Sequence, residues 1–188
     1  GTLTLTGTTL DRNSAGGKGG GIENQFNALT LVGSTLSGNT AQTSGGGIDN
    51  LYGPVSLTNS TLSGNTSGAG GGIANAGTLT LTNVTLTANH SYGDFGGALT
   101  NTHVTILFNT LAAGNLIGNG STTPGDIQGA VDASSSNNLV GVGDAMTGIT
   151  NGSQGNLVGS TANPIDAKLG TLGLNGGPTL TVALLAGS

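Results

Sequence analysis

The acidic side chains are the first candidates for chemistry, because paired carboxylates can hold Ca²⁺ or act as general acid and base. Two of them, Glu23 and Asp49, occupy equivalent places in successive copies of a repeated phrase, so we expect them to lie one strand apart. The next copies carry Ala74 and Thr100 there, which ends the cluster at two. One interpretation is a weak Ca²⁺ site at Glu23 and Asp49; we favour a pair of solvated carboxylates.

The other reactive side chains do not form a recognisable catalytic set. Asp11 and Arg12 fall at a different corner of the repeat, where we predict an edge ion pair worth less than about 1 kcal/mol. His90 and His103 fall in different parts of the coil, which disfavours a two-histidine metal site. No Gly-x-Ser-x-Gly motif is present. We therefore predict no catalytic residue, no cofactor and no enzymatic activity.

A repeat must position these side chains. It is clearest at 70–89, with earlier copies at 19–39 and 45–65, a fragment at 2–13 and a decayed copy at 96–115. A unit of about 25 residues cannot bury its own apolar face and must stack on its neighbours. The repeat therefore predicts a solenoid.

Each copy contains three strand signals: a Leu-Thr-Leu-Thr alternation, a Thr-Leu pair and a Gly-Gly-Gly-Ile segment. Alternation puts leucine on one face of a strand and threonine on the other. The pattern predicts an all-β fold, a right-handed parallel β-helix with three short strands per coil and coils of about 24–26 residues. The predicted apolar columns are Leu5, Leu31, Leu57, Leu81 and Ile106, and Ile22, Ile48, Ile73 and Leu99.

Asparagine recurs at two corners of the coil. Stacked amides can hydrogen-bond along the axis, and asparagine tolerates the backbone of a tight corner. The predicted ladders are Asn13, Asn39, Asn65 and Asn89, and Asn24, Asn50, Asn75 and Asn101.

The amino-acid composition limits the classes of partner that we expect for this chain. Three basic and eight acidic residues give a net charge of −5, which disfavours nucleic acid. No apolar run reaches membrane-spanning length, and the absence of cysteine excludes disulfides. We expect regular coils over 1–115 and irregular coils of the same domain over 116–188. Because the chain opens inside a copy of the phrase, we also expect it to be part of a longer exported protein.

Short motifs carry two resemblances. Gly-Gly-Ala-Leu at 96–99 and Leu-x-x-Asn at 36–39, 62–65 and 86–89 resemble the motifs of polymorphic outer-membrane autotransporter passengers, with Leu in place of the usual Phe. The tail carries Asn-Leu-Val-Gly at 138–141 and 156–159, Asn-Pro-Ile-Asp at 163–166 and Asn-Gly-Gly-Pro-Thr at 175–179. It is similar to the end of bacterial β-helix surface proteins of the choice-of-anchor Q type. This resemblance implies export, a pectate-lyase-like solenoid and a surface or matrix role without assigned catalytic residues.

Three functions follow as hypotheses. The first is a non-enzymatic structural or adhesive protein, secreted to a cell surface or matrix, that assembles end to end with itself or with flanking domains. The second is a carbohydrate-binding or polysaccharide-lyase-like β-helix that takes surface glycans. The third is ice binding by an outward threonine ladder. The predicted ladder is Thr4, Thr6, Thr30, Ser56, Thr58, Thr80, Thr82 and Thr105, interrupted by Val32 and Leu107.

Overall fold

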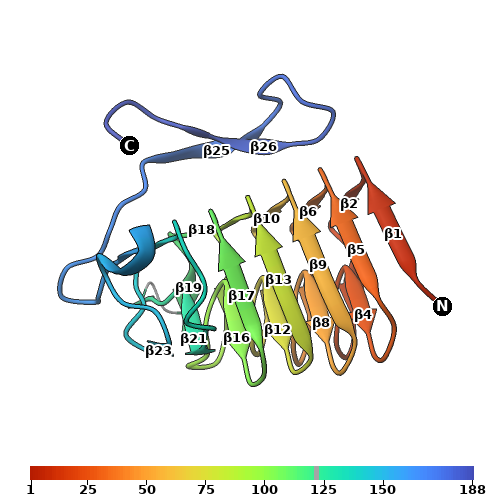
Figure 1. The fold of residues 1–188 in the computed structure, drawn as a ribbon. Helices are drawn as coiled ribbons and strands as arrows, with labels where there is room; N and C mark the ends of the chain where they lie inside the picture. Colours follow the sequence, from red (N-terminus) through yellow and green to blue (C-terminus); the bar gives the residue numbers. More distant parts are fainter. Residues whose placement is uncertain (121–122) are drawn as a thin grey trace.

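Four mainly parallel β-sheets surround a common apolar core, and successive coils of the chain add neighbouring strands to each sheet (Figure 1). The computed structural model describes residues 1–120 and 123–188. Each coil lies on the one before it, so the chain is a β-solenoid, as the repeat predicted.

The strands of the four sheets are as follows. Sheet A contains β1 (Leu3–Thr6), β5 (Leu29–Val32), β9 (Pro54–Thr58), β13 (Thr78–Thr82) and β17 (Thr105–Phe108). Sheet B contains β2 (Thr9–Asp11), β6 (Thr35–Ser37), β10 (Thr61–Ser63), β14 (Thr85–Thr87), β18 (Leu111–Ala112), β22 (Leu139–Val140) and β24 (Leu157–Val158). Sheet C contains β3 (Ser14–Ala15), β7 (Thr40–Ala41), β11 (Thr66–Ser67), β15 (His90–Ser91), β19 (Leu116–Ile117) and the antiparallel β20 (Thr123–Pro124). Sheet D contains β4 (Ile22–Asn24), β8 (Ile48–Asn50), β12 (Ile73–Asn75), β16 (Leu99–Asn101), β21 (Ile127–Ala130) and β23 (Met146–Thr147).

The three strands predicted for each coil are those of sheets A, B and D. Sheet C adds a two-residue strand directly after each asparagine of the first ladder, for example Thr40–Ala41 after Asn39. Its members are mixed in type and too short for alternation to show, so the pattern did not reveal it.

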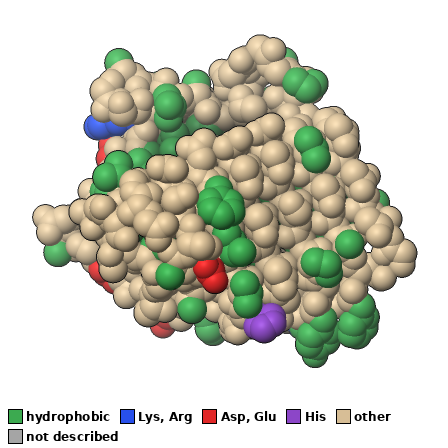
Figure 2. All heavy atoms as spheres, in the orientation of Figure 1, with side chains coloured by type: hydrophobic (Ala, Val, Ile, Leu, Met, Phe, Trp, Pro, Cys, Tyr) green, Lys and Arg blue, Asp and Glu red, His purple; other side chains and the backbone are tan. Residues whose placement is uncertain are grey.

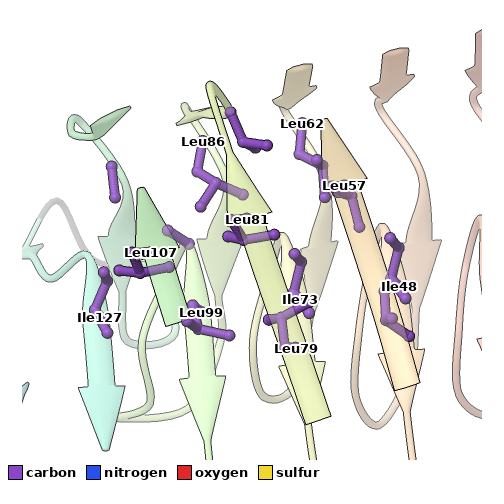
Figure 3. Close-up of a cluster of buried hydrophobic side chains, with 14 of the residues drawn as sticks. Ile48, Leu57, Leu62, Ile73, Leu79, Leu81, Leu86, Leu99, Leu107 and Ile127 are labelled. Carbon is purple, nitrogen blue, oxygen red and sulfur yellow. The ribbon is translucent and has the colours of Figure 1, made fainter. Parts of the chain in front are cut away.

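The leucine and isoleucine columns point into the space between the sheets, as Figure 3 shows for residues of the second to fifth coils. Ile22, Ile48, Ile73 and Leu99 are in register on sheet D, and Ile127 extends this column. In the interior coils, the side chains of these columns have essentially no exposed surface. Burial of this apolar surface is the main force that holds the coils together.

The predicted sheet A column was wrong in its last member. Leu81 pairs with Leu107, whereas Ile106 pairs with Thr80 and faces outward. Thr105 therefore pairs with Leu79 and is buried like it. The Thr105 hydroxyl accepts a hydrogen bond from Nδ2 of Asn75 at 3.2 Å. This register follows from the pairing of Asn75 with Asn101 on sheet D. The segment from Asn75 to Leu79 is as long as the segment from Asn101 to Thr105, so Leu79 and Thr105 also pair.

Both asparagine ladders are confirmed. In the first, each Nδ2 donates to the Oδ1 of the next coil at 2.9 Å, and each backbone N–H donates to the same oxygen. Asn89 passes this pattern on to Asn115. In the second ladder the Nδ2-to-Oδ1 distances are 2.9, 2.7 and 2.8 Å. The amides thus satisfy buried polar groups at two corners of the coil.

The glycine pairs ahead of β4, β8 and β12 allow close backbone approach. A Cβ atom built on Gly46 would lie 2.4 Å from the carbonyl oxygen of Gly71 and 2.5 Å from the backbone nitrogen of Thr66. No side chain fits at that distance, so glycine is required by packing between coils.

The end of the chain folds back along the solenoid. After the 3₁₀ turn η1 (Ser153–Gly155), the antiparallel strands β25 (Leu169–Gly173) and β26 (Thr181–Leu184) form a hairpin that lies across the coils (Figure 1). Oγ1 of Thr35 donates to the carbonyl of Leu180 at 2.6 Å, and Oγ1 of Thr179 donates to that of Gly33 at 2.9 Å. The hairpin thus contacts the outward face of sheet B near its second coil.

Candidate functional site

Glu23 and Asp49 lie in register on neighbouring strands of sheet D, as their equivalent places in the repeat predicted. Their environments differ. Glu23 is exposed, and its Oε1 accepts a hydrogen bond from Nε2 of Gln25 at 3.0 Å. Asp49 is only 4% exposed, and its Oδ1 accepts a hydrogen bond from Oγ of Ser44. The expectation that both carboxylates are solvated is therefore wrong for Asp49, because the next coils build up around it.

The second carboxylate oxygen of Asp49 is unusual. Among the side chains that the structure describes, Oδ2 of Asp49 is the one buried nitrogen or oxygen atom without a hydrogen-bond partner. Burial raises the pKa of Asp49 above its ordinary value, while the hydrogen bond from Ser44 and the charge of Lys18 act in the opposite direction. An unpaired oxygen of this kind is energetically unfavourable unless a further group donates to it.

A hollow of about 160 Å³ lies beside Asp49. It forms because the third coil has alanine at two successive outward positions, Ala74 and Ala76. The larger side chains of the second coil, including Leu51, flank it on one side, and Thr100 and Thr102 of the fourth coil flank it on the other. Lys18 and Ser44 complete the wall.

The hollow has little of the character of a metal site. Within residues 1–120 and 123–188, no three side chains of His, Asp or Glu gather closely enough to hold a metal ion. Ca²⁺ takes six to eight oxygen ligands, and Glu23 directs one carboxylate oxygen to Gln25. Lys18 also places a positive charge beside Asp49.

Two exposed aromatic rings follow the same strands. Phe26 and Tyr52 stack with their centroids 5.3 Å apart and an interplanar angle of 20°, and they are 67% and 63% exposed. Tyr52 comes directly after Leu51, which lines the hollow. Sequence reasoning missed this pair, although both rings stand two residues after an asparagine of the second ladder in successive coils.

The remaining candidates lie apart from this site. Arg12 pairs with Asp11 at 3.2 Å, which confirms the predicted edge ion pair. Nε2 of His90 donates to the carbonyl of Gly118 at 2.9 Å, whereas His103 is exposed ahead of β17. The two histidines occupy different strands and turns, as predicted.

Asp126 is a second buried carboxylate that the sequence did not single out. Its Oδ1 accepts from the backbone N–H and the Nδ2 of Asn115, and its Oδ2 accepts from the N–H of Val142 at 2.6 Å. Burial raises its pKa to about 6, against the effect of these hydrogen bonds. Because both oxygens are satisfied within the protein, we interpret Asp126 as structural.

The outward face of sheet A carries two columns of mostly small polar residues. The columns are Thr4, Thr30, Ser56, Thr80 and Ile106, and Thr6, Val32, Thr58, Thr82 and Phe108. Thr105 and Leu107 point inward, so their predicted places on this face were wrong. Both columns end in a large apolar residue, and ice binding remains an untested prediction.

The first coil has an open side. Strands β1, β2, β3 and β4 each pair with one neighbour among the described residues, in the second coil. Leu3 is 48% exposed, whereas its register partner Leu29 is 2% exposed. The apolar interior of the solenoid thus reaches solvent at this end.

Figure 2 shows a face with few charged side chains and with scattered hydrophobic ones, some of which lie next to one another. The described part of the chain contains no helix with the length and apolarity needed to cross a membrane. No protein-family model matches this chain, and searches of the curated proteins and of the solved structures gave no match either.

Proposed function

We propose that the protein is a non-enzymatic structural or adhesive element of a cell surface or extracellular matrix, whose first coil stacks end to end on a further coil. That coil comes from a second copy of this chain or from a flanking domain of a longer parent protein, and the tests below address the association of copies of this chain. The observation that carries this proposal is the open side of the first coil. Since an isolated coil cannot bury its own apolar face, the exposed end of a solenoid favours another coil as its partner.

The apolar cross-section supports the proposal. Leu5, Leu10 and Ile22 are partly exposed in the first coil, while Leu31, Leu36 and Ile48, their register partners in the second, are fully buried. A coil placed on this end would bury the first three in the same way. Complete burial of such a side chain is worth about 1.5–3 kcal/mol, so a partly exposed one gains a fraction of that.

Backbone groups at this end are also available for pairing. The N–H of Leu3 donates to Ala28 at 3.0 Å, and that of Gly7 donates to Val32 at 2.9 Å. Because donors alternate along a strand, the N–H groups of Thr4 and Thr6 point away from β5. They form an edge that a strand from a second copy can extend.

The charges of the first coil do not oppose such a contact. Its charged side chains are Asp11, Arg12, Lys18 and Glu23, so the positive and negative charges balance. Two copies that meet through their first coils would therefore experience little net repulsion. We expect this contact to give a two-fold symmetric dimer, in which the edge strands run antiparallel.

Sedimentation velocity and light scattering over a range of concentrations test the association. We expect the mass to double reversibly as concentration rises. The variant Thr4→Pro removes an N–H from the open edge and spares the pairing with β5, so it should remain monomeric with an unchanged melting temperature. The matched control Thr4→Ala keeps that N–H and should associate like the wild type.

A wild-type chain that keeps the monomer mass at the highest soluble concentration would overturn the proposed association. Equal association of Thr4→Pro and the wild type would show that the first coil is not the contact. The extracellular location has its own test, antibody labelling of intact source cells, and labelling only after lysis would contradict it.

A further inference from the structure

We propose that the hollow beside Asp49 binds a neutral saccharide, with one sugar unit in the hollow and a neighbouring unit against the rings of Phe26 and Tyr52. This inference goes beyond the structural role proposed above and does not depend on association through the first coil. It begins from the unpaired, buried Oδ2 of Asp49, which lacks a hydrogen-bond donor.

The polar groups around the hollow are mostly acceptors. Oγ of Ser44 directs its hydrogen to Asp49. Thr100 and Thr102 donate their hydroxyl hydrogens to the carbonyls of Gly96 and Asn75, at 3.4 and 3.3 Å. The three hydroxyl oxygens therefore have lone pairs left for a ligand, as does Oδ2 of Asp49.

Lys18 supplies the opposite function. Its ammonium group is a donor without acceptor capacity, and Lys18 is one of the residues that line the hollow. A ligand that fits must donate several hydrogen bonds and accept at least one. Sugar hydroxyls do both, because each carries one O–H donor and two lone pairs.

Size and charge favour a neutral molecule over an ion. The hollow of about 160 Å³ holds several waters at about 30 Å³ each, so it is larger than a single cation requires. Among the described residues Asp49 is the one acid that lines it, and it is acted on by the positive charge of Lys18 and by the negative charge of Glu23 on the neighbouring strand. A uronate would bring a second carboxylate towards Asp49, which disfavours acidic sugars.

The stacked rings give the site its second half. Phe26 and Tyr52 expose most of their surface to solvent, and they follow β4 and β8, the neighbouring strands that carry Glu23 and Asp49, by two residues each. Flat aromatic surface next to a few convergent polar groups is typical of small-molecule sites. The apolar face of a pyranose ring matches such a surface.

Titration of the ¹⁵N-labelled chain, followed by amide chemical shifts, tests the site. The probes are cellohexaose, mannohexaose and chitohexaose as neutral oligosaccharides, hexagalacturonate as an acidic one, and CaCl₂ alone. We expect saturable shifts around Ser44, Asp49 and Ala74 with at least one neutral probe, at a dissociation constant in the millimolar range or below. Hexagalacturonate should bind more weakly than that probe.

Three variants sharpen the result. Asp49→Asn should weaken binding about tenfold or more, since the charged acceptor is lost while the contact with Ser44 can persist. Ala74→Leu fills the hollow and should abolish binding, and Tyr52→Ala should weaken it through loss of the stacking surface. The control Asp132→Asn removes an exposed carboxylate elsewhere and should bind like the wild type.

Several outcomes would overturn the inference. They are no saturable shift with any neutral probe, equal binding by Ala74→Leu and the wild type, or saturation by CaCl₂ alone at the same amides. The first of these would mean that only water satisfies Asp49. The titrations use the monomeric Thr4→Pro variant in parallel, so that their outcome is separate from that of end-to-end association.

Discussion

Asp126 accepts two hydrogen bonds from Asn115 at a single oxygen, Oδ1, from the backbone N–H at 3.0 Å and from Nδ2 at 2.7 Å. This contact ends the first asparagine ladder. Every asparagine before it donates towards the following coil, and a carboxylate has no hydrogen to pass on. The ladder therefore has a direction. Its last member is an acceptor, and Asn13 in the first coil accepts no hydrogen bond at Oδ1 from the described residues.

Stability should rise as the pH falls from 7 towards 4. Burial raises the pKa of Asp126 from its ordinary value of 3.8 to about 6, so the folded chain binds this proton more tightly than the unfolded chain. The stabilisation is fully present below 3.8 and is lost as the pH rises through about 6, with a size of about 3 kcal/mol. Asp49, whose pKa is also raised, acts in the same direction. Urea unfolding at several pH values measures the effect.

The matched variant is Asp126→Asn, which does not titrate. Its oxygen can still accept from Asn115, whereas its amide meets the N–H of Val142 as a second donor. We expect a much flatter dependence of stability on pH between 4 and 7. If the variant and the wild type share the same slope, Asp126 is not the group responsible.

The ladder should contribute strongly to stability at its centre. Asn65 is fully buried, accepts from Asn39 and donates to Leu36 and Asn89. Asn65→Ala leaves several buried groups unpaired and should reduce the free energy of unfolding by about 2–4 kcal/mol.

The control for Asn65→Ala is Asn83→Gly. Asn83 belongs to an exposed row of amides, in which it donates to Asn59 and accepts from Asn109, and it has a φ of 55°, which glycine adopts without strain. We expect a loss of less than about 1 kcal/mol in urea unfolding. Equal losses at both positions would show that burial of the ladder does not matter.

The corrected register of sheet A gives a paired test. Leu107→Ala removes a fully buried side chain and should destabilise the chain by about 2–5 kcal/mol. Ile106→Ala truncates a half-exposed side chain and should cost about 1 kcal/mol or less. Thermal and urea unfolding of both variants measure the difference, and a larger loss at Ile106 would contradict the register.

Close packing between coils predicts a sharp contrast between two glycines. Gly46→Ala places a Cβ atom 2.4 Å from the backbone of Gly71, so the coils must separate, and we expect a loss above about 3 kcal/mol or failure to fold. A Cβ atom on Gly17 meets nothing within 4 Å, so Gly17→Ala should change stability by less than about 0.5 kcal/mol. Circular dichroism with thermal unfolding distinguishes them, and similar stabilities would refute the packing argument.

Much of the fold can be inferred from the residues alone. Alternation of leucine and threonine assigns the inner and outer faces of a strand, and a period of about 25 residues assigns the coil. Asparagine at fixed places in each copy predicts the ladders, since equal spacing brings equal residues together. These features depend on a strand or on repetition, so no knowledge of the intervening loops is needed.

Other features depend on contacts between coils. The sequence at 104–108 is compatible with either Ile106 or Leu107 in the core. The pairing of Asn75 with Asn101 places Leu107 there. The hollow beside Asp49 is lined by Ala74 and Ala76 of the next coil, whose side chains are small.

Sequence alone thus determined the coil, its strands and its ladders, because these follow from local alternation and a regular period. Only the tertiary structure decided the burial of Asp49 and Asp126, the stacking of Phe26 on Tyr52 and the return of the hairpin onto sheet B. Each of these depends on which side chains from separate coils or distant segments meet. Loop lengths and the sizes of neighbouring side chains determine these contacts, and neither of them produces a periodic pattern in the sequence.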